Sequence, residues 1–242
     1  RWIIGIVLGL YIGIILLLNI PYVQHQMSVL VAKELSSVLG SRLTIGRINI
    51  GLLNRIIIDD LMLNDQSGKE LLKVGRLSAK FEILPLFNGR ISIGNVQLFS
   101  FNANLEKPTP QATSNFQFVL DAFASKDTVK KKSNLDLRIN SLLIRRGRVS
   151  YDVLSAERTP GKFNPQHIRL SNILANISLK ALQSDSINAA IKRMSVEEDH
   201  SGFELKKLSL KIVANNKKMW IENFAIDLPN TSLAMDLSLI HI

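Results

Sequence analysis

One spacing of apolar residues recurs along most of the chain: two in alternation, a two-residue interruption, and two more in alternation. Its occurrences begin at Leu43, Ile56, Leu72, Ile91, Leu137, Ile168, Ala189, Phe203 and Met219. Alternation with a period of two is typical of β-strands that have one buried face. The interruption would turn the second half of each strand to the other face unless the backbone absorbs it in a bulge or a tight corner.

The interrupting pairs consist mostly of turn-prone or charged residues, which suit bulges and corners. They are Gly46-Arg47, Asp59-Asp60, Gly75-Arg76, Gly94-Asn95, Asn140-Ser141, Ser171-Asn172, Lys192-Arg193, Lys206-Lys207 and Glu222-Asn223. We therefore predict a mainly β protein whose antiparallel or mixed sheet bends strongly, keeps one apolar face and curls into a groove. Ordinary hairpins in a β-sandwich would give similar spacings and are the alternative.

The N-terminal segment differs from the rest because Trp2 to Leu18 contains no charged residue. Its seventeen residues lie at the short end of what spans a hydrocarbon core. A cleaved signal peptide is the alternative, but the exit over residues 19–23 offers no small-x-small cleavage site. Arg1 on the short flank favours a cytoplasmic N-terminus. We predict a single-pass anchor over residues 1–20, in the inner membrane of a two-membrane bacterium, with the body in the periplasm.

Within this anchor, Gly5, Gly9 and Gly13 recur every four residues and share one helix face. Such a face allows close approach of a second membrane helix. Because glycine is frequent in membrane helices anyway, packing against a partner and the absence of a partner both stay open.

Residues 21–40 form a predicted amphipathic helix, with apolar residues at helical spacing and Gly40 at the position of a left-handed C-cap. This helix either lies on the membrane surface or plugs the near end of the β body, and its single Lys33 favours the plug. A first β segment covers 41–107, and a loop, a short helix after Ser114 and a charged linker cover 108–134. A second β segment begins at 135 and runs to 242, where we expect it to be truncated.

Neither metal-ligand spacing nor a catalytic motif is found in the sequence. Cysteine is absent, and the four histidines, His25, His167, His200 and His241, are isolated from one another. The paired carboxylates of Asp59-Asp60 point to opposite faces of a strand, so a turn is their expected role. We therefore expect no enzyme activity, no metal and no cofactor. The net charge of +10 favours anionic lipid headgroups as the acidic partner, and the basic clusters lack the interleaved aromatics of nucleic-acid binding.

The predicted apolar face has few helices to cover it, and large exposed apolar areas usually mark binding surfaces. For a membrane-anchored chain, the obvious apolar ligand is a phospholipid acyl chain. The candidate lining residues of the groove alternate along two predicted strands and are Ile56, Ile58, Leu61, Leu63, Ile91, Ile93, Val96 and Leu98.

Several segments resemble the AsmA-like family, and its TamB branch in particular. They are the anchor, the amphipathic helix and Leu43–Ile50, Ile58–Val74, Leu84–Leu98 and Leu142–Tyr151. The resemblance implies an inner-membrane anchor and a long sheet curled into a lipid-lined groove. It also implies a role in outer-membrane biogenesis, through phospholipid transport or through protein assembly and secretion. An outer-membrane barrel partner would be met through a distal C-terminal region that this sequence lacks.

Three functional hypotheses follow. The first is a conduit along which acyl chains slide over the apolar positions. The second is a scaffold whose sheet edges accept strands of client proteins, as in a translocation and assembly module. The third is an anchored β-sandwich that acts as an adhesin or sensor, with a closed and dry core.

Overall fold

The computed structural model describes residues 2–51, 54–82, 91–123, 135–136, 140–183, 186–215, 218–235 and 240–241. Two helices, α1 (Trp2–Leu18) and α2 (Pro21–Leu39), precede the strands, and a short helix, α4 (Gln117–Phe123), lies between two of them. The strands are β1 (Leu43–Gly51), β2 (Arg55–Asn64), β3 (Glu70–Glu82), β4 (Ile91–Lys107), β5 (Leu135–Asp136), β6 (Ser141–Val153), β7 (His167–Gln183), β8 (Ser186–Glu198), β9 (Phe203–Asn215), β10 (Lys218–Leu228), β11 (Thr231–Met235) and β12 (Ile240–His241).

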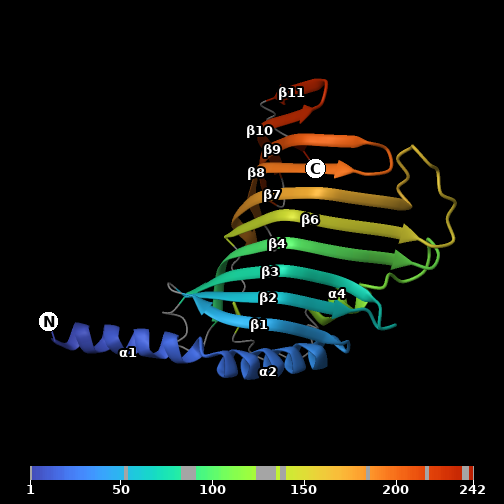
Figure 1. Ribbon diagram of the computed structural model, residues 1–242. Helices are drawn as coiled ribbons and strands as arrows, with labels where there is room; N and C mark the ends of the chain where they lie inside the picture. The colour runs from blue at the N-terminus through green and yellow to red at the C-terminus, as the bar shows by residue number, and fades with distance from the viewer. Residues whose placement is uncertain are drawn as a thin grey trace.

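All described strands belong to one open, mixed sheet (Figure 1). Its main path runs β1-β2-β3-β4-β6-β7-β8-β9-β10-β11, while β5 pairs with β4 and β12 pairs with β10. Neighbours are antiparallel except where β4 pairs with β5 and β6, because the chain crosses over through the α4 region before it returns. The mainly β class is confirmed. The two predicted β segments share this sheet, so the described strands do not form the two packed sheets of the alternative.

The sequence interruptions coincide with breaks in strand pairing. Asp60, Asn172 and Asn223, each the second residue of a predicted interrupting pair, have φ of 55°, 51° and 52°. These are left-handed conformations, which Asn and Asp tolerate better than most residues. Further pairing breaks fall between Ile191 and Met194 of β8. The predicted interruptions at these pairs are therefore confirmed: the register shifts at the breaks of β7, β8 and β10, whereas at Asp60 the pairing skips one residue on each strand without a shift. With Gly46 opposite Asp60 on β1 and Gly75 beside Ser100, the breaks form a row that crosses the sheet.

Two interruptions are missing from the prediction. The break within β6 comes at Arg146, with φ of 55°, and a second break in β4 comes at Ser100, with φ of 54°. The predicted pair Asn140-Ser141 lies at the start of β6, and the apolar residues expected before it, Leu137 and Ile139, fall outside the described residues.

The row of breaks divides the apolar face into two halves. The half toward the tight β2–β3 and β8–β9 hairpins is called the cap half, because α2 and α4 pack there. Its core joins Leu39 of α2 to Leu43, Leu63 and Leu71 of the sheet, with partly buried side chains of α4 packed against them. A second cluster of buried residues continues along the neighbouring strands and consists of Ile173, Val196 and Leu205.

Helix α2 has the predicted bounds and ends at Gly40, whose φ is 63° and whose N–H donates to the carbonyl of Ser36. Its Ala32, Leu35 and Leu39 pack into the core, as expected of a plug. Leu30 and Val38, which belong to the same predicted apolar stripe, are instead exposed at 61% and 64%. The helix therefore carries apolar side chains on its outer side as well.

Helix α1 extends beyond the sheet (Figure 1), and most of its apolar side chains are exposed, Trp2 at 88%. Within the described residues, no single helix meets the length and hydropathy expected of a membrane span. Gly5–Leu18 and Pro21–Leu39 meet them only jointly, as a pair bent by 71°.

Candidate functional site: an apolar sheet face

The strand register aligns the apolar residues into unbroken rows that run perpendicular to the strands. The first row contains one residue from each strand of the main path: Ile48, Ile58, Leu77, Leu98, Ile144, Ala175, Met194, Leu208, Ile226 and Leu233. At a strand spacing of about 4.8 Å, ten strands make this row roughly 40 Å long. The same spacing repeated in each strand therefore builds one continuous apolar track across the sheet.

A second row runs beside the first, farther from the cap half. It contains Ile50, Ile56, Ala79, Val96, Leu142, Ile177, Ile191 and Leu210. These two rows form what we call the junction half, because Ile50 lies at the junction of α1 and α2. There the side-chain Nδ2 of Asn19 donates to the carbonyl of Ile50 at 2.8 Å.

The two halves differ in burial. In the cap half, Leu63 is 4% and Val74 is 2% exposed. In the junction half, the large side chains are mostly half-buried, and Ile48, at 3%, is the main exception. Neighbouring strands shield these side chains laterally, while α2 and α4 pack their apolar residues into the cap-half core.

The predicted lining residues fall on both sides of this division. Ile56, Ile58, Val96 and Leu98 lie in the two rows of the junction half and are half-buried. Leu61 and Leu63 lie in the cap half and are buried, so they are core rather than lining. Ile91 and Ile93 lie in β4, and their side chains fall outside the described residues.

The predicted lining residues did not include Leu77 of β3. Leu77 pairs with both Ile58 and Leu98, so it lies between them and joins them into one surface. The predicted lining residues also did not include Ile144, although the repeat that begins at Leu137 contains it. Their signal is present in the repeat itself, but only the strand order shows which occurrence pairs with which.

A chain of polar contacts fixes the α1–α2 junction to the edge of the sheet. The Nε2 atom of buried Gln24 donates to Oδ1 of Asn49 at 2.6 Å and to Oδ1 of Asn19 at 3.2 Å. Asn49 in turn donates to Asp59 at 3.4 Å, and Asp59 accepts from Arg76 at 2.6 Å. Hydrogen bonds that reach β1, β2 and β3 therefore set the orientation of α1 relative to the sheet.

Helix α2 covers one edge of the sheet, at β1. The Oγ atom of Ser36 accepts from the backbone N–H of Leu43 at 2.9 Å and donates to its carbonyl at 3.3 Å. Covering an edge strand in this way hinders pairing with another chain. At the opposite edge, all residues of β11 (Thr231–Met235) are exposed.

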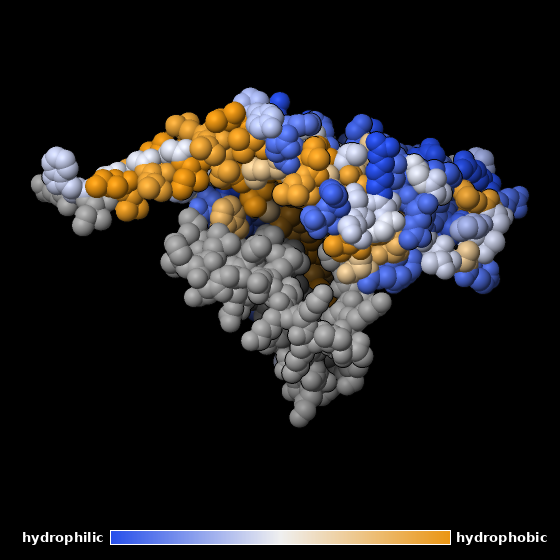
Figure 2. All heavy atoms as spheres, turned by 90° about the horizontal axis from the view of Figure 1, so that it is seen from below, coloured by the Kyte–Doolittle hydropathy of each residue, from blue (hydrophilic) through white to orange (hydrophobic). Residues whose placement is uncertain are grey.

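Apolar surface extends from α1 along α2. Figure 2 shows it as an orange band that follows the two helices, with polar residues gathered toward the other end of the view. Tyr22 and Val29 of α2 are exposed at 72% and 52%. Gly5, Gly9 and Gly13 face open space, because a Cβ atom at any of them would meet nothing within 4 Å.

Two buried carboxylates lock tight turns at the hairpin end of the sheet. Burial raises the pKa of Glu198, but hydrogen bonds from the hydroxyl and N–H of Ser201 and from the N–H groups of Arg169 and His200 outweigh it, and its pKa falls to about 2. The pKa of Asp65 is likewise lowered, where burial opposes hydrogen bonds from Ser67 and Lys69. Both carboxylates hold backbone N–H groups of the turns, and Nδ1 of His200 also lies 3.3 Å from Oε1 of Glu198.

The described residues contain no group of three or more His, Cys, Asp or Glu placed to hold a metal ion. His167 lies between Oδ1 of Asp152 at 2.8 Å and the carbonyl of Ala156 at 3.0 Å, so both of its ring nitrogens are engaged in a structural contact. The candidate site is the surface formed by the two apolar rows. Comparison of the chain with models of known families and with curated proteins finds no match to either.

Proposed function

We propose that the chain is an inner-membrane-anchored periplasmic protein whose apolar sheet face conducts phospholipid acyl chains between membranes. The observation that carries this proposal is the first row of apolar residues, which continues without a polar interruption across ten strands. In the proposed state, the bent sheet curls around this row as a groove. Headgroups stay in solvent while the hydrocarbon tails contact the row.

Sliding along such a row needs weak and repeated contacts rather than a tight site. Burying one methylene group contributes about 0.8 kcal/mol, and each step along the row exchanges one aliphatic contact for an equivalent one. Half-buried Ile58 and Leu98 have side-chain surface left to contribute, whereas buried Leu63 has little. The junction half is therefore the proposed lipid path, and the cap half is its closed side.

The proposed entry point is the α1–α2 junction. In this proposal α1 lies in the bilayer and the outer side of α2 lies at the membrane surface, which the exposed apolar side chains of α1 and the exposed Tyr22 and Val29 support. Ile50, the first member of the second row, is hydrogen-bonded to Asn19 between these helices. A lipid leaving the bilayer there would meet the apolar face at once.

Photo-crosslinking tests the lipid path with a matched pair of neighbouring positions. A photoreactive phenylalanine analogue at Leu98 faces the row, and the same group at Phe99 faces the opposite side of the sheet, because successive strand residues alternate. We expect phospholipid adducts from position 98 in cells, and at least tenfold fewer from position 99. Equal yields at both positions would contradict the proposal.

A charge variant tests conduction itself. Leu98→Asp should reduce copurifying phospholipid, because a carboxylate in the row raises the cost of hydrocarbon contact. Gln97→Asp places the same charge on the polar face and should leave lipid unchanged. Circular dichroism should show that both variants fold. Full lipid loading of a folded Leu98→Asp variant would argue against conduction.

The second candidate function is a scaffold for outer-membrane protein assembly or secretion. The exposed strand β11 favours it, because an uncovered edge can accept a strand from a client. Native mass spectrometry of the detergent-solubilised chain separates the candidates. Bound phospholipid supports the conduit, and bound client peptide without lipid supports the scaffold.

A further inference from the structure

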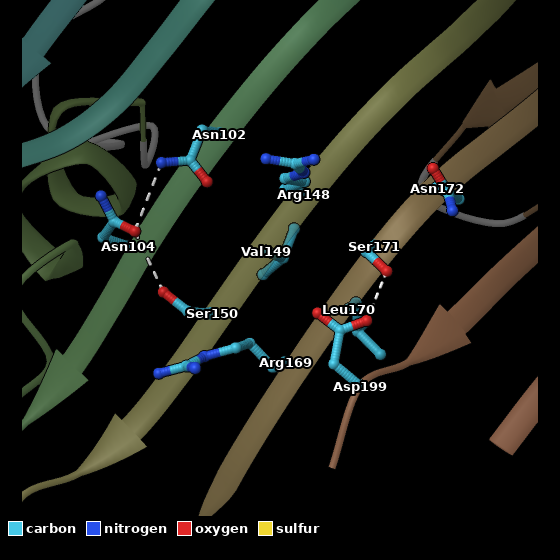
Figure 3. A pocket seen from close by; sticks show the side chains of 10 residues that line it. All are labelled: Asn102, Asn104, Arg148, Val149, Ser150, Arg169, Leu170, Ser171, Asn172 and Asp199. Carbon is cyan, nitrogen blue, oxygen red and sulfur yellow. Dashed lines mark hydrogen bonds between the residues drawn. The ribbon is translucent and has the colours of Figure 1, made fainter. Parts of the chain in front are cut away.

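The polar face of the sheet contains a cleft that the lipid path does not use. It has a volume of about 500 Å³ and lies over β4, β6 and β7 (Figure 3). The register places its side chains in two short rows: Asn102 beside Arg148, and Asn104 beside Ser150 and Arg169. Because these residues alternate with apolar ones such as Ala103 and Val149, the cleft lies on the face opposite the apolar rows.

Two arginines dominate the cleft. Arg148 and Arg169 are exposed, and neither forms an ion pair with any residue in the described part of the chain. Figure 3 shows the side chain of Arg169 extending from β7 across β6 toward Ser150. An unpaired guanidinium group offers five N–H donors in a planar fork, which matches the oxygens of a phosphate or carboxylate group.

The floor beneath the arginines is held in place by hydrogen bonds. Oδ1 of Asn104 accepts from Ser150 at 3.1 Å and from Asn102 at 3.5 Å, and its Nδ2 donates to the carbonyl of Glu70 at 3.2 Å. Both polar atoms of the Asn104 side chain are therefore hydrogen-bonded, and they orient the side chains of Asn102 and Ser150. The floor is therefore fixed, while the guanidinium groups above it are available to a ligand.

The charge around the cleft is positive overall. A second recess of about 310 Å³ adjoins it, shares Asn102 and Arg148, and adds Arg146. The one carboxylate that lines the main cleft is Asp199, whose Oδ1 accepts from the hydroxyl of Ser171 at 2.5 Å at the far side. Two arginines and one carboxylate therefore line the main cleft, and the carboxylate already accepts a hydrogen bond from Ser171.

The row of breaks explains why the recess forms here. Ser100, Arg146 and Asn172 have positive φ on three neighbouring strands, and all three line the smaller recess. Positive φ in a non-glycine residue costs of order 1 kcal/mol or more. These three residues lie on β4, β6 and β7, where the smaller recess opens next to Arg148.

We propose that this cleft binds a phosphate group, with Arg148 and Arg169 as its principal ligands and Asn102 as an additional donor. No aromatic side chain lines the main cleft, so base stacking does not assist, and the ligand is a small phosphate-bearing group. This site does not depend on the lipid path, because the two lie on opposite faces of the sheet. A free phosphate ester and a lipid headgroup share the required chemistry.

Calorimetric titration of the detergent-solubilised full chain tests the site with inorganic phosphate and with glycerol 3-phosphate. We expect saturable binding of at least one of them. The double variant Arg148→Gln, Arg169→Gln should weaken binding at least tenfold. The control Arg193→Gln removes an exposed arginine of β8 outside the cleft and should change binding less than twofold. Absence of binding to both compounds, or equal binding by wild type and the double variant, would overturn the proposal.

The source of the phosphate is distinguished by repeating the titration in lipid nanodiscs. If a headgroup is the ligand, phosphatidylglycerol nanodiscs will weaken glycerol 3-phosphate binding at least fivefold relative to a detergent that contains no phosphate. If a soluble ester is the ligand, nanodiscs and detergent will give the same affinity. Both results support a phosphate site and assign its source. In either medium, equal binding by wild type and the double variant would overturn the site.

Discussion

The two halves of the apolar face are built from the same repeat, yet one is core and the other is surface. On β2, Leu63 in the cap half is 4% exposed, whereas Ile58, five residues earlier on the same face, is half-buried. The difference comes from the helices, because α2 and α4 bring apolar side chains to Leu63. Around Leu63 the repeat therefore specifies which face is apolar, and helices outside the repeat bury it, whereas Ile173, Val196 and Leu205 are buried among side chains of the strands.

The largest expected effect of this difference is on stability. Leu63→Ala should lower the free energy of unfolding by about 3 kcal/mol, because it leaves a cavity among packed neighbours. Leu98→Ala removes the same atoms from the junction half and should cost about 1 kcal/mol or less, because part of that side chain already contacts solvent. Denaturant unfolding of the two variants measures the contrast. Equal costs would mean that the junction half is also a packed core.

The boundary between the halves depends on a glycine. A Cβ atom at Gly147 would lie 2.3 Å from Cε1 of Phe101, so Gly147→Ala should destabilise the protein by about 2 kcal/mol through overpacking. Gly94→Ala is the control, because a Cβ atom at Gly94 would lie an ordinary 3.5 Å from Nδ2 of Asn140. In the double variant Phe101→Leu, Gly147→Ala, the smaller side chain should recover part of the loss. If the double variant recovers no stability, contact with the ring of Phe101 is not the reason that position 147 needs glycine.

The repeat made the apolar face and most of its breaks predictable, because alternation and turn chemistry are local properties. The break at Arg146 was not predictable in this way, because only the pairing of β6 with β4 and β7 places it. Burial was not predictable in this way. Leu63 matches the same pattern as Ile56 and Ile58, and its cluster with apolar residues of α2 and α4 distinguishes it from them. The arginine cleft was hidden as well, since it joins β4 and β7, far apart in sequence.

The pH dependence of stability probes the cap half. The pKa of Glu198 is lowered to about 2 in the folded state from 4.5, so its stabilising contribution is present above about pH 4.5 and disappears as the pH falls toward 2. Glu198→Gln should cost about 1 to 2 kcal/mol at pH 7 and should flatten the stability profile between pH 4.5 and 2. Unfolding measured across this range tests the assignment. Glu197→Gln, at an exposed neighbour, is the control and should keep the steep acid limb.

The smallest expected effect on stability comes from the hydrogen bonds that join α1 to the junction half. Gln24→Ala removes the donor to Asn49 and Asn19, and it should lower stability by about 1 kcal/mol. Its more specific consequence is a broader distribution of α1 orientations, because Asn19 then keeps only its own bonds to the carbonyls of Ile15 and Ile50. Pulsed electron–electron double resonance between spin labels at positions 10 and 206 measures the distribution of distances between α1 and β9.

Gln26→Ala is the matched control for this experiment, since Gln26 is two residues along the same helix and exposed. Its distance distribution should match that of the wild type. If Gln24→Ala leaves the distribution equally narrow, the polar chain does not orient the helix, and the packing of Leu35 and Leu39 alone holds α2 to the sheet. The entry to the junction half would then be fixed by the cap half, so the two halves would be coupled through one helix rather than held separately.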